Sequence, residues 1–303
     1  MPKRREANKV IADKARSKTP LRLRIIRLSL FFLVVAYLAF SPLTWASILE
    51  FQPVKYPCTE YGCTEVLGVK REEALFQTPS GQTLHGWFFR KPGAHYTMLI
   101  HHGQTGNLAI SLGLVATLLY CGNSAFIYDY EGYGRSTGSP SNAALCADGE
   151  VAFDYLVHTL HVEPANIVEY GVSLGSGVAS HVATVRPCAA VILVSPYKSL
   201  IEVSREFMPF LKLYPNFLFP RPDLGANEFI KSNRTIPLLL IHGQLDPIIR
   251  VHHAQELYAM ASCPKKLVIE PHVHHGDFST LFLAKQITSF LGSIARGNHS
   301  SLD

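Results

Sequence analysis

The residue pattern with the clearest chemistry is Gly171-Val172-Ser173-Leu174-Gly175, a G-x-S-x-G motif. An apolar run at 167–170 precedes it, and a helix-compatible run at 176–185 follows. Between a strand and a helix this motif is typical of a nucleophile elbow, a sharp turn that projects a serine hydroxyl above a sheet. Taken alone, the motif also fits an ordinary glycine-rich turn, so its interpretation depends on the partners of Ser173.

A serine hydroxyl is a weak nucleophile that needs a base, and the base needs a third group to orient it. Asp246 fits the third role, because it follows the apolar run 238–242 at the edge where open α/β sheets gather their sites. After the next predicted strand, 266–270, come three candidate bases: His272, His274 and His275. The chain order of serine, acid and histidine is the one that accompanies such an elbow.

The oxyanion that forms during attack needs two N–H donors. One is predicted to be the backbone amide of Leu174, which directly follows the serine. The other is expected from the loop His101-His102-Gly103-Gln104-Thr105-Gly106-Asn107, which leaves an apolar strand and enters a helix. We select the amide of Gln104. The alternative is that this loop is a generic strand–helix turn.

The body of the chain alternates between strand and helix patterns after an opening hairpin. Strands are predicted at 72–77, 83–90, 97–101, 125–129, 167–172, 189–195, 238–242 and 266–270, and helices at 108–120, 143–160, 176–185, 252–261 and 280–295. This alternation predicts an α/β fold with a mostly parallel sheet flanked by helices.

One segment, about 197–235, interrupts the alternation and is rich in large apolar residues, among them Phe207, Phe210, Phe217 and Phe219. It is either a lid over a pocket or an extra helix pair packed on the core. A lid is favoured, because a plain connector would not need so many large apolar groups.

The N-terminus differs from the body in charge and hydropathy. Residues 1–27 carry ten basic and two acidic side chains, whereas the rest of the 303-residue chain carries 18 and 21, a net charge of −3. The uncharged run 28–49 follows, which predicts a transmembrane signal anchor with a cytoplasmic tail and a catalytic domain on the non-cytoplasmic side. The alternative is a cleaved secretory signal. This placement of the basic tail argues against nucleic acid as a partner.

Cysteines and the remaining histidines indicate neither a metal nor a cofactor. Cys58 and Cys63 could form a small disulfide loop or remain free thiols, and no C-x-x-C pair indicates zinc. His252 and His253 open a predicted helix, where adjacent side chains should point to different faces, so a shared metal is not expected.

Four segments resemble the α/β-hydrolase fold family, and within it the membrane-anchored α/β-hydrolase-domain serine hydrolases, which include lysophospholipases and acyl-protein thioesterases. They are the loop 99–107, similar to H-G-N-A-G-N; Tyr128-Asp129-Tyr130-Glu131-Gly132-Tyr133-Gly134-Arg135-Ser136, similar to D-Y-R-G-Y-G-x-S; the elbow; and His242-Gly243 with Asp246. The family's H-N-D pattern aligns with His275-Gly276-Asp277 and implies His275 as the base. Two residues depart from the pattern: Gly276 replaces Asn, and Glu131 replaces Arg or Pro and is expected to alter the pocket rim.

The resemblance implies a serine hydrolase acting on esters or thioesters, with lipid-like acyl groups favoured. Its catalytic residues would be Ser173, Asp246 and His275. A serine amidase or peptidase and a catalytically idle binding protein are the alternatives. The expected division is a tail 1–27, an anchor 28–49, a linker 50–64, a hydrolase domain 65–295 with its lid at about 197–235, and a tail 296–303.

Overall fold

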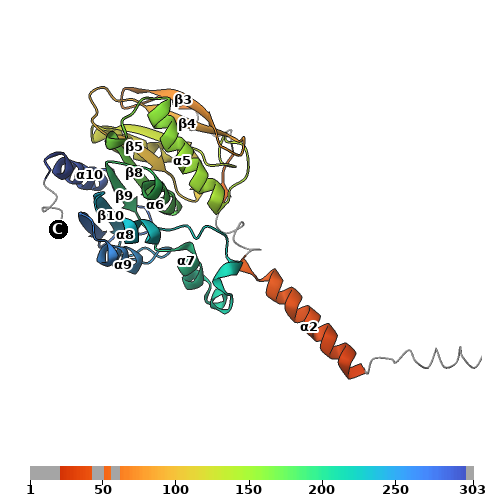
Figure 1. The fold of residues 1–303 in the computed structure, drawn as a ribbon. Coiled ribbons are helices and arrows are strands. Elements are labelled where there is room, and N and C mark those ends of the chain that lie inside the picture. Colours follow the sequence, from red (N-terminus) through yellow and green to blue (C-terminus); the bar gives the residue numbers. More distant parts are fainter. Residues whose placement is uncertain (1–20, 43–50, 56–61, 298–303) are drawn as a thin grey trace, which may run out of the picture.

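The structure is a computed structural model that describes residues 21–42, 51–55 and 62–297. Within these residues nine strands pair into one twisted sheet in the order β11-β10-β9-β8-β5-β7-β4-β3-β2 (Figure 1). The strands are β2 (Glu65–Val66), β3 (Val69–Gln77), β4 (Thr83–Phe89), β5 (Thr97–His101), β7 (Ser124–Tyr128), β8 (Ile167–Val172), β9 (Ala190–Val194), β10 (Leu238–Gly243) and β11 (Lys265–Glu270). The six neighbouring strands β11, β10, β9, β8, β5 and β7 pair in parallel, and β4, β3 and β2 add an antiparallel edge next to β7.

Helices cover both faces of this sheet. They are α4 (Leu112–Tyr120), α5 (Asn142–His158), α6 (Leu174–Val185), α7 (Leu200–Phe207), α8 (Asn227–Ser232), α9 (His252–Met260) and α10 (Thr280–Ala295). Side chains of α4 and α10 share one core cluster with the sheet, whereas α5 and α6 pack together on the opposite face. Strands covered on both faces must be apolar throughout, which explains why β5, β9 and β10 are continuous apolar runs.

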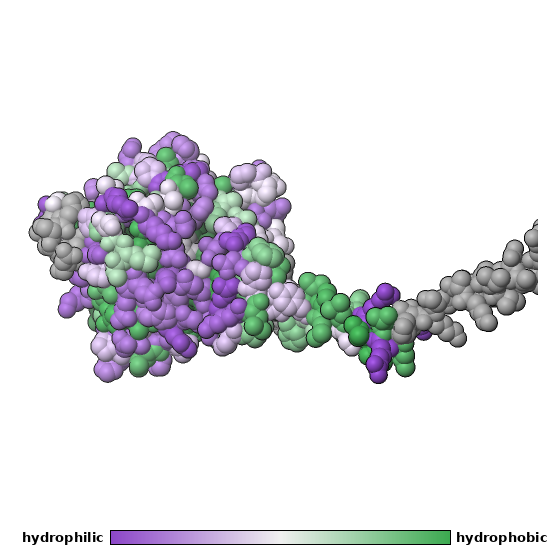
Figure 2. All heavy atoms as spheres, turned by 60° about the horizontal axis from the view of Figure 1, so that its bottom comes forward, coloured by the Kyte–Doolittle hydropathy of each residue, from purple (hydrophilic) through white to green (hydrophobic). Residues whose placement is uncertain are grey.

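The membrane-spanning segment expected at 28–49 is not found, so the single-pass topology inferred from it is wrong. None of the helices in the described residues is long and apolar enough to cross a membrane. Helix α2 (Leu21–Ala39) begins seven residues earlier than the uncharged run and therefore includes three arginines, Arg22, Arg24 and Arg27. Its uncharged part, 28–39, is about 18 Å long at 1.5 Å per residue, short of a hydrocarbon core of about 30 Å. Figure 2 shows its exposed apolar side chains beside the globular body.

A short strand appears where the sequence predicted only a linker. Strand β1 (Gln52–Pro53) pairs in parallel with β6 (Thr105–Gly106), which lies in the loop after β5. Two residues, one of them proline, leave no periodicity from which a strand can be predicted. Cys58 lies outside the described residues, so the choice between a disulfide with Cys63 and two free thiols falls outside them as well.

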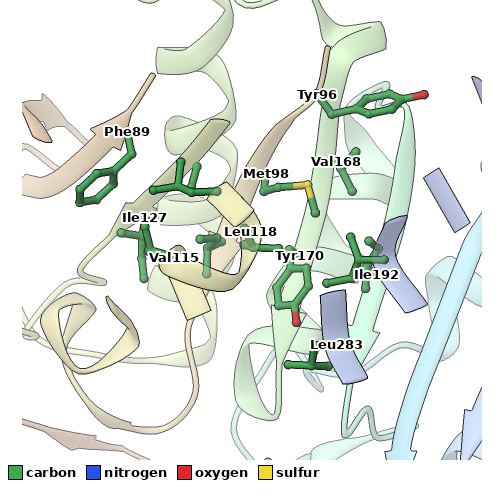
Figure 3. Close-up of a cluster of buried hydrophobic side chains, with 14 of the residues drawn as sticks. Phe89, Tyr96, Met98, Val115, Leu118, Ile127, Val168, Tyr170, Ile192 and Leu283 are labelled. Atoms are coloured by element: carbon green, nitrogen blue, oxygen red, sulfur yellow. The ribbon is translucent and has the colours of Figure 1, made fainter. Parts of the chain in front are cut away.

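The main core cluster lies between the centre of the sheet and the helices α4 and α10 (Figure 3). Met98, Val168, Tyr170 and Ile192 from the central strands meet Val115, Leu118 and Leu283 from these helices. Fully burying an aliphatic side chain of this size contributes roughly 1.5–3 kcal/mol, so this cluster holds the parallel strands in register. The predicted mostly parallel sheet flanked by helices is confirmed, and the strand 97–101, the strand 167–172 and the helix 280–295 have the predicted bounds.

Candidate active site

Ser173 stands on a strained turn between β8 and α6. Its backbone has φ 52° and ψ −119°, a conformation that a residue with a side chain rarely adopts. The two motif glycines make the turn possible: a Cβ on Gly171 would lie 2.5 Å from the carbonyl oxygen of Gly175, and one on Gly175 would fall on the carbonyl of His101. The G-x-S-x-G sequence therefore forms the predicted elbow for steric reasons.

The structure brings the serine, the acid and one of the three histidines together. The Nε2 atom of His275 lies 2.9 Å from the Ser173 hydroxyl, and its Nδ1 lies 2.7 Å from Oδ2 of Asp246. With the proton on Nδ1, the imidazole donates to the carboxylate, and the serine hydroxyl can donate to Nε2. This is the arrangement that lets a histidine remove a proton from a serine.

Asp246 is held ionised and oriented by the loop after β10. Its Oδ1 accepts hydrogen bonds from the amides of Ile248 and Ile249, each at 2.9 Å, and Oδ2 faces His275. Burial by itself would raise the pKa of this carboxyl, but the hydrogen bond and charge of His275 and the two amides outweigh it, so the pKa of Asp246 is lowered. His242 lies beneath the loop and donates from Nε2 to the carbonyl of Ile249, and burial lowers its pKa.

Gly276, which replaces the family's usual Asn, occupies a left-handed backbone conformation with φ 76°. Glycine and asparagine are the residues that tolerate this region best, so the departure preserves the turn after His275. Gly243 fixes the same loop from the other side, because a Cβ there would lie 2.7 Å from the carbonyl oxygen of His274. The backbone conformation at Gly276 and the close contact at Gly243 therefore explain why His275 faces Ser173.

The loop proposed to supply the oxyanion donor lies against the elbow. The Tyr130 hydroxyl donates to the carbonyl of His102 at 3.0 Å, and the Tyr133 hydroxyl donates to the carbonyl of Gln104 at 2.7 Å. Gly103 lies between these two loop residues, and a Cβ atom built on it would be 3.8 Å from the Cβ of Ser173. The two tyrosines thus hold this loop in position. In the sequence they belong to a segment that resembles the family, but their role in holding the loop was not predicted.

An apolar cavity of about 390 Å³ opens at Ser173. Its wall combines Gln104 and Leu174 with side chains of the insertion 197–235, among them Ile201, Val203, Phe207, Met208, Leu211 and Phe219. Phe210 and Phe217, expected in the same role, do not line it and are 44% and 75% exposed. The insertion therefore forms a pocket wall with only part of its aromatic residues.

Glu131 does not lie on the cavity rim, contrary to the expectation from the sequence. Its side chain is buried and accepts hydrogen bonds from the hydroxyls of Thr78 and Ser80, at 3.3 and 3.0 Å. Its amide donates to Asp148, whose pKa burial raises to about 8. This departure from the family segment thus stabilises the hairpin between β3 and β4.

The rings of His252 and His253 do not point apart, as expected, but stack with their centroids 4.5 Å apart. Both Nε2 atoms approach Oε1 of Glu206, at 3.1 and 3.5 Å, so these three residues have the composition of a metal site. The backbone N–H of Lys198, however, points at Nδ1 of His253 from 3.5 Å. A metal-bound histidine normally donates from its other nitrogen, so a donor there argues against a metal on His253.

Comparison with known proteins agrees with this architecture. The family model described as serine aminopeptidase, S33, matches residues 93–229. An uncharacterized protein of Mycobacterium tuberculosis is 35% identical over 207 residues, which cover 68% of this chain and 72% of that protein. Alpha/beta hydrolase domain-containing protein 17C of Xenopus tropicalis is 37% identical over 201 residues, 65% of this chain and 60% of its own length.

Among solved structures, an esterase of Pyrococcus furiosus superimposes with a TM-score of 0.65 at 20% identity, covering 82% of this chain and 97% of the esterase. At this identity the likeness concerns the fold. Together with the sequence relatives it defines the class: the chain belongs to the α/β-hydrolase family, and a hydrolase activity is supported.

Proposed function

We propose that this protein is a serine hydrolase that cleaves carboxylic esters or thioesters through an acyl-enzyme on Ser173. The observation that carries the proposal is the strained serine, which lines an apolar cavity with its hydroxyl 2.9 Å from Nε2 of His275. Strain at a residue that also has a base partner is typical of functional sites.

In the proposed mechanism Ser173 attacks the acyl carbon while Nε2 of His275 takes its proton. Asp246 stabilises the imidazolium by accepting from Nδ1, and it fixes the tautomer before reaction. The amides of Leu174 and Gln104 stabilise the oxyanion, a contribution worth about 10²–10³ in rate per donor in comparable enzymes. His275 then returns the proton to the leaving alkoxide or thiolate, and water hydrolyses the acyl-enzyme by the same steps.

The lining of the cavity favours a neutral, lipid-like acyl group. Asp223 is the one charged side chain among the described residues that line it. Each of its oxygens already accepts one hydrogen bond, Oδ2 from the Ser199 hydroxyl at 2.6 Å and Oδ1 from the amide of Ile201 at 3.2 Å. The remaining wall offers mostly apolar contact, which suits an acyl chain.

The name of the matching family model keeps aminopeptidase activity as the second candidate. An aminopeptidase must bind the ammonium group of its substrate, and a carboxylate is the usual partner. Asp223 is the available carboxylate in the described cavity wall, and its two hydrogen bonds fix it to the first turn of α7. The ester or thioester proposal is the better supported of the two, because the rest of the described cavity wall is mostly apolar.

Labelling with a fluorophosphonate probe tests the proposal and separates it from an idle binding protein. The full-length chain should be labelled and should hydrolyse a short p-nitrophenyl ester, and Ser173→Ala should lose both properties while its thermal transition stays. Ser289→Ala, which removes an exposed hydroxyl on α10, is the control and should be labelled normally. Labelling that persists in Ser173→Ala would contradict the proposal. Aminopeptidase substrates cleaved faster than esters would favour the second candidate.

A further inference from the structure

The segment 51–55, which we call the strap, crosses the loop that precedes η2 (Leu108–Ser111). Two of its backbone amides donate into this loop: Gln52 to the carbonyl of Gln104 at 3.2 Å, and Val54 to the carbonyl of Gly106 at 2.8 Å. Two side chains of the loop donate in the opposite direction: Thr105 to the Gln52 side chain at 3.0 Å, and Asn107 to the Val54 carbonyl at 3.1 Å.

The far side of the strap is fixed to the segment that follows β7. Gly134 donates its amide to the Val54 carbonyl at 3.1 Å, and the Lys55 ammonium donates to the carbonyl of Ser136 at 3.1 Å. Phe51 is buried in the core cluster formed with α5 and α6. The strap is therefore fixed at both ends. Its hydrogen bonds to the loop can then hold the loop in one position.

The strap contacts the proposed oxyanion donor at the carbonyl of Gln104. It accepts from the Gln52 amide on one side and from the Tyr133 hydroxyl, at 2.7 Å, on the other. The preceding carbonyl of His102 accepts from Tyr130. The Gln104 amide belongs to the peptide unit whose carbonyl is that of Gly103, and this carbonyl accepts from Nδ1 of His102 at 2.8 Å. The carbonyls on either side, of His102 and Gln104, are also hydrogen-bonded, so rotation of the peptide unit that carries the Gln104 amide is restrained.

We propose that the strap is a positioning element of the active site, which holds the oxyanion loop in the conformation that presents the Gln104 amide to the reacting carbonyl. The inference rests on the proposed function. It goes further, because it gives a catalytic consequence to a segment outside the nine-stranded sheet. A donor that must act on charge developing in the transition state contributes only if it is oriented beforehand.

The N-terminal segment also forms part of the cavity wall. Pro42 and Gln52 both line the cavity that contains Ser173. Tyr37, near the end of α2, stacks on Tyr214 of the insertion with ring centroids 4.5 Å apart. The Tyr214 hydroxyl donates to the carbonyl of Tyr37 at 2.9 Å. The chain before β2 thus contacts both the oxyanion loop and the pocket wall.

The test compares single substitutions in the full-length chain. Gln52→Pro removes the amide that holds the Gln104 carbonyl, and Asn107→Asp removes the side-chain donor to Val54 while keeping the oxygen that caps η2. Glu65→Pro is the matched control, because it places a proline in another two-residue edge strand, β2, away from the site. Turnover of a short acetate ester is measured per active site titrated with a fluorophosphonate, which corrects for any unfolded fraction.

We expect Gln52→Pro to lower kcat per titrated site about tenfold and to change KM less than twofold, because the lost interaction acts in the transition state. Asn107→Asp should lower kcat about threefold, and Glu65→Pro should leave it unchanged. Because Gln52 and Tyr133 hold the same carbonyl, the effects of Gln52→Pro and Tyr133→Phe should not add.

An unchanged kcat in Gln52→Pro, or in Asn107→Asp if the proline variant does not fold, would overturn the strap proposal. Equal losses in Gln52→Pro and Glu65→Pro would also overturn it, since they would reflect general destabilisation. A wild-type chain that the fluorophosphonate does not label would instead contradict the proposed function. Hydrogen exchange gives a readout without catalysis: the amides of Gln52 and Val54 should be protected in the wild type, and their free exchange would contradict the clamped geometry.

Discussion

The elbow and the insertion line the same cavity, and they are built differently. At the elbow, backbone sterics decide: Gly171 and Gly175 permit a strained serine, and buried hydrogen bonds orient its partners. In the insertion, side chains of α7 and of the short 3₁₀ turns, some buried and some exposed, form a wall. We therefore expect activity to depend on a few sterically constrained positions at the elbow, and selectivity to depend on the packing of the cavity wall.

The largest effect is expected at the base. His275→Ala should lower turnover of a short ester by several powers of ten, because the serine loses its proton acceptor. His274→Ala should leave turnover near the wild-type value, because the neighbouring side chain makes no contact with Ser173 or Asp246 among the hydrogen bonds of the site. Steady-state kinetics of the two variants provide the measurement. An active His275→Ala with a dead His274→Ala would mean that the loop register is different.

A smaller but still large effect is expected from a methyl group at the elbow. Gly175→Ala would place a Cβ on the carbonyl of His101, so the elbow must move and activity should fall by about 10²-fold or more, with a lower thermal transition. Gly113→Ala in α4 is the matched control, because a Cβ there has open space. It should keep activity and add about 0.5–1 kcal/mol of helix stability. Equal behaviour of the two variants would contradict the steric account.

The insertion should respond by changing selectivity. Phe219 lines the cavity and is 4% exposed, whereas Phe217 is 75% exposed and lies outside the wall. Phe219→Ser should lower kcat/KM for a long-chain ester about tenfold more than for an acetate ester, because apolar contact of this size is worth about 1–3 kcal/mol. Phe217→Ser should lower neither. Equal losses of both activities in Phe219→Ser would show that this residue only supports the fold.

The smallest effect concerns stability and pH at a buried acid away from the cavity. Burial raises the folded-state pKa of Asp148 to about 8, above its usual value in an unfolded chain. The folded state therefore holds this proton more tightly, so the stabilisation is complete below about pH 4 and is lost as the pH rises towards 8. Chemical denaturation of the wild type should show stability falling from pH 6 to 8, and Asp148→Asn should show a flatter profile. A steeper loss in Asp148→Asn would contradict this sign.

The parts predictable from sequence are those set by local rules. The strand 167–172 and the glycines around Ser173 follow from apolar runs and steric demands that act within a few residues. The order of Asp246 and His275 along the chain follows from where parallel strands end. Their hydrogen bonds match the predicted arrangement, and their catalytic roles remain a proposal.

The parts that could not be predicted depend on tertiary contacts. Strand β1 consists of Gln52 and Pro53 and exists only because a distant loop offers it partners. The stacking of His252 on His253 depends on Glu206, which comes from another helix. The uncharged run 28–49 led to the wrong prediction of a membrane span, because hydropathy does not show where a helix begins and which charges it includes.

The central claim is a covalent acyl-enzyme on Ser173, and trapping it is the most direct measurement. The full-length protein is mixed with a slowly hydrolysed p-nitrophenyl ester, quenched in acid during the burst of p-nitrophenol and digested for peptide mass spectrometry. We predict the mass of one acyl group on the peptide that contains Ser173, and none on this peptide in Ser173→Ala. Steady ester turnover with the acyl group on another residue, or with no acylated peptide under conditions that give a burst, would contradict the account.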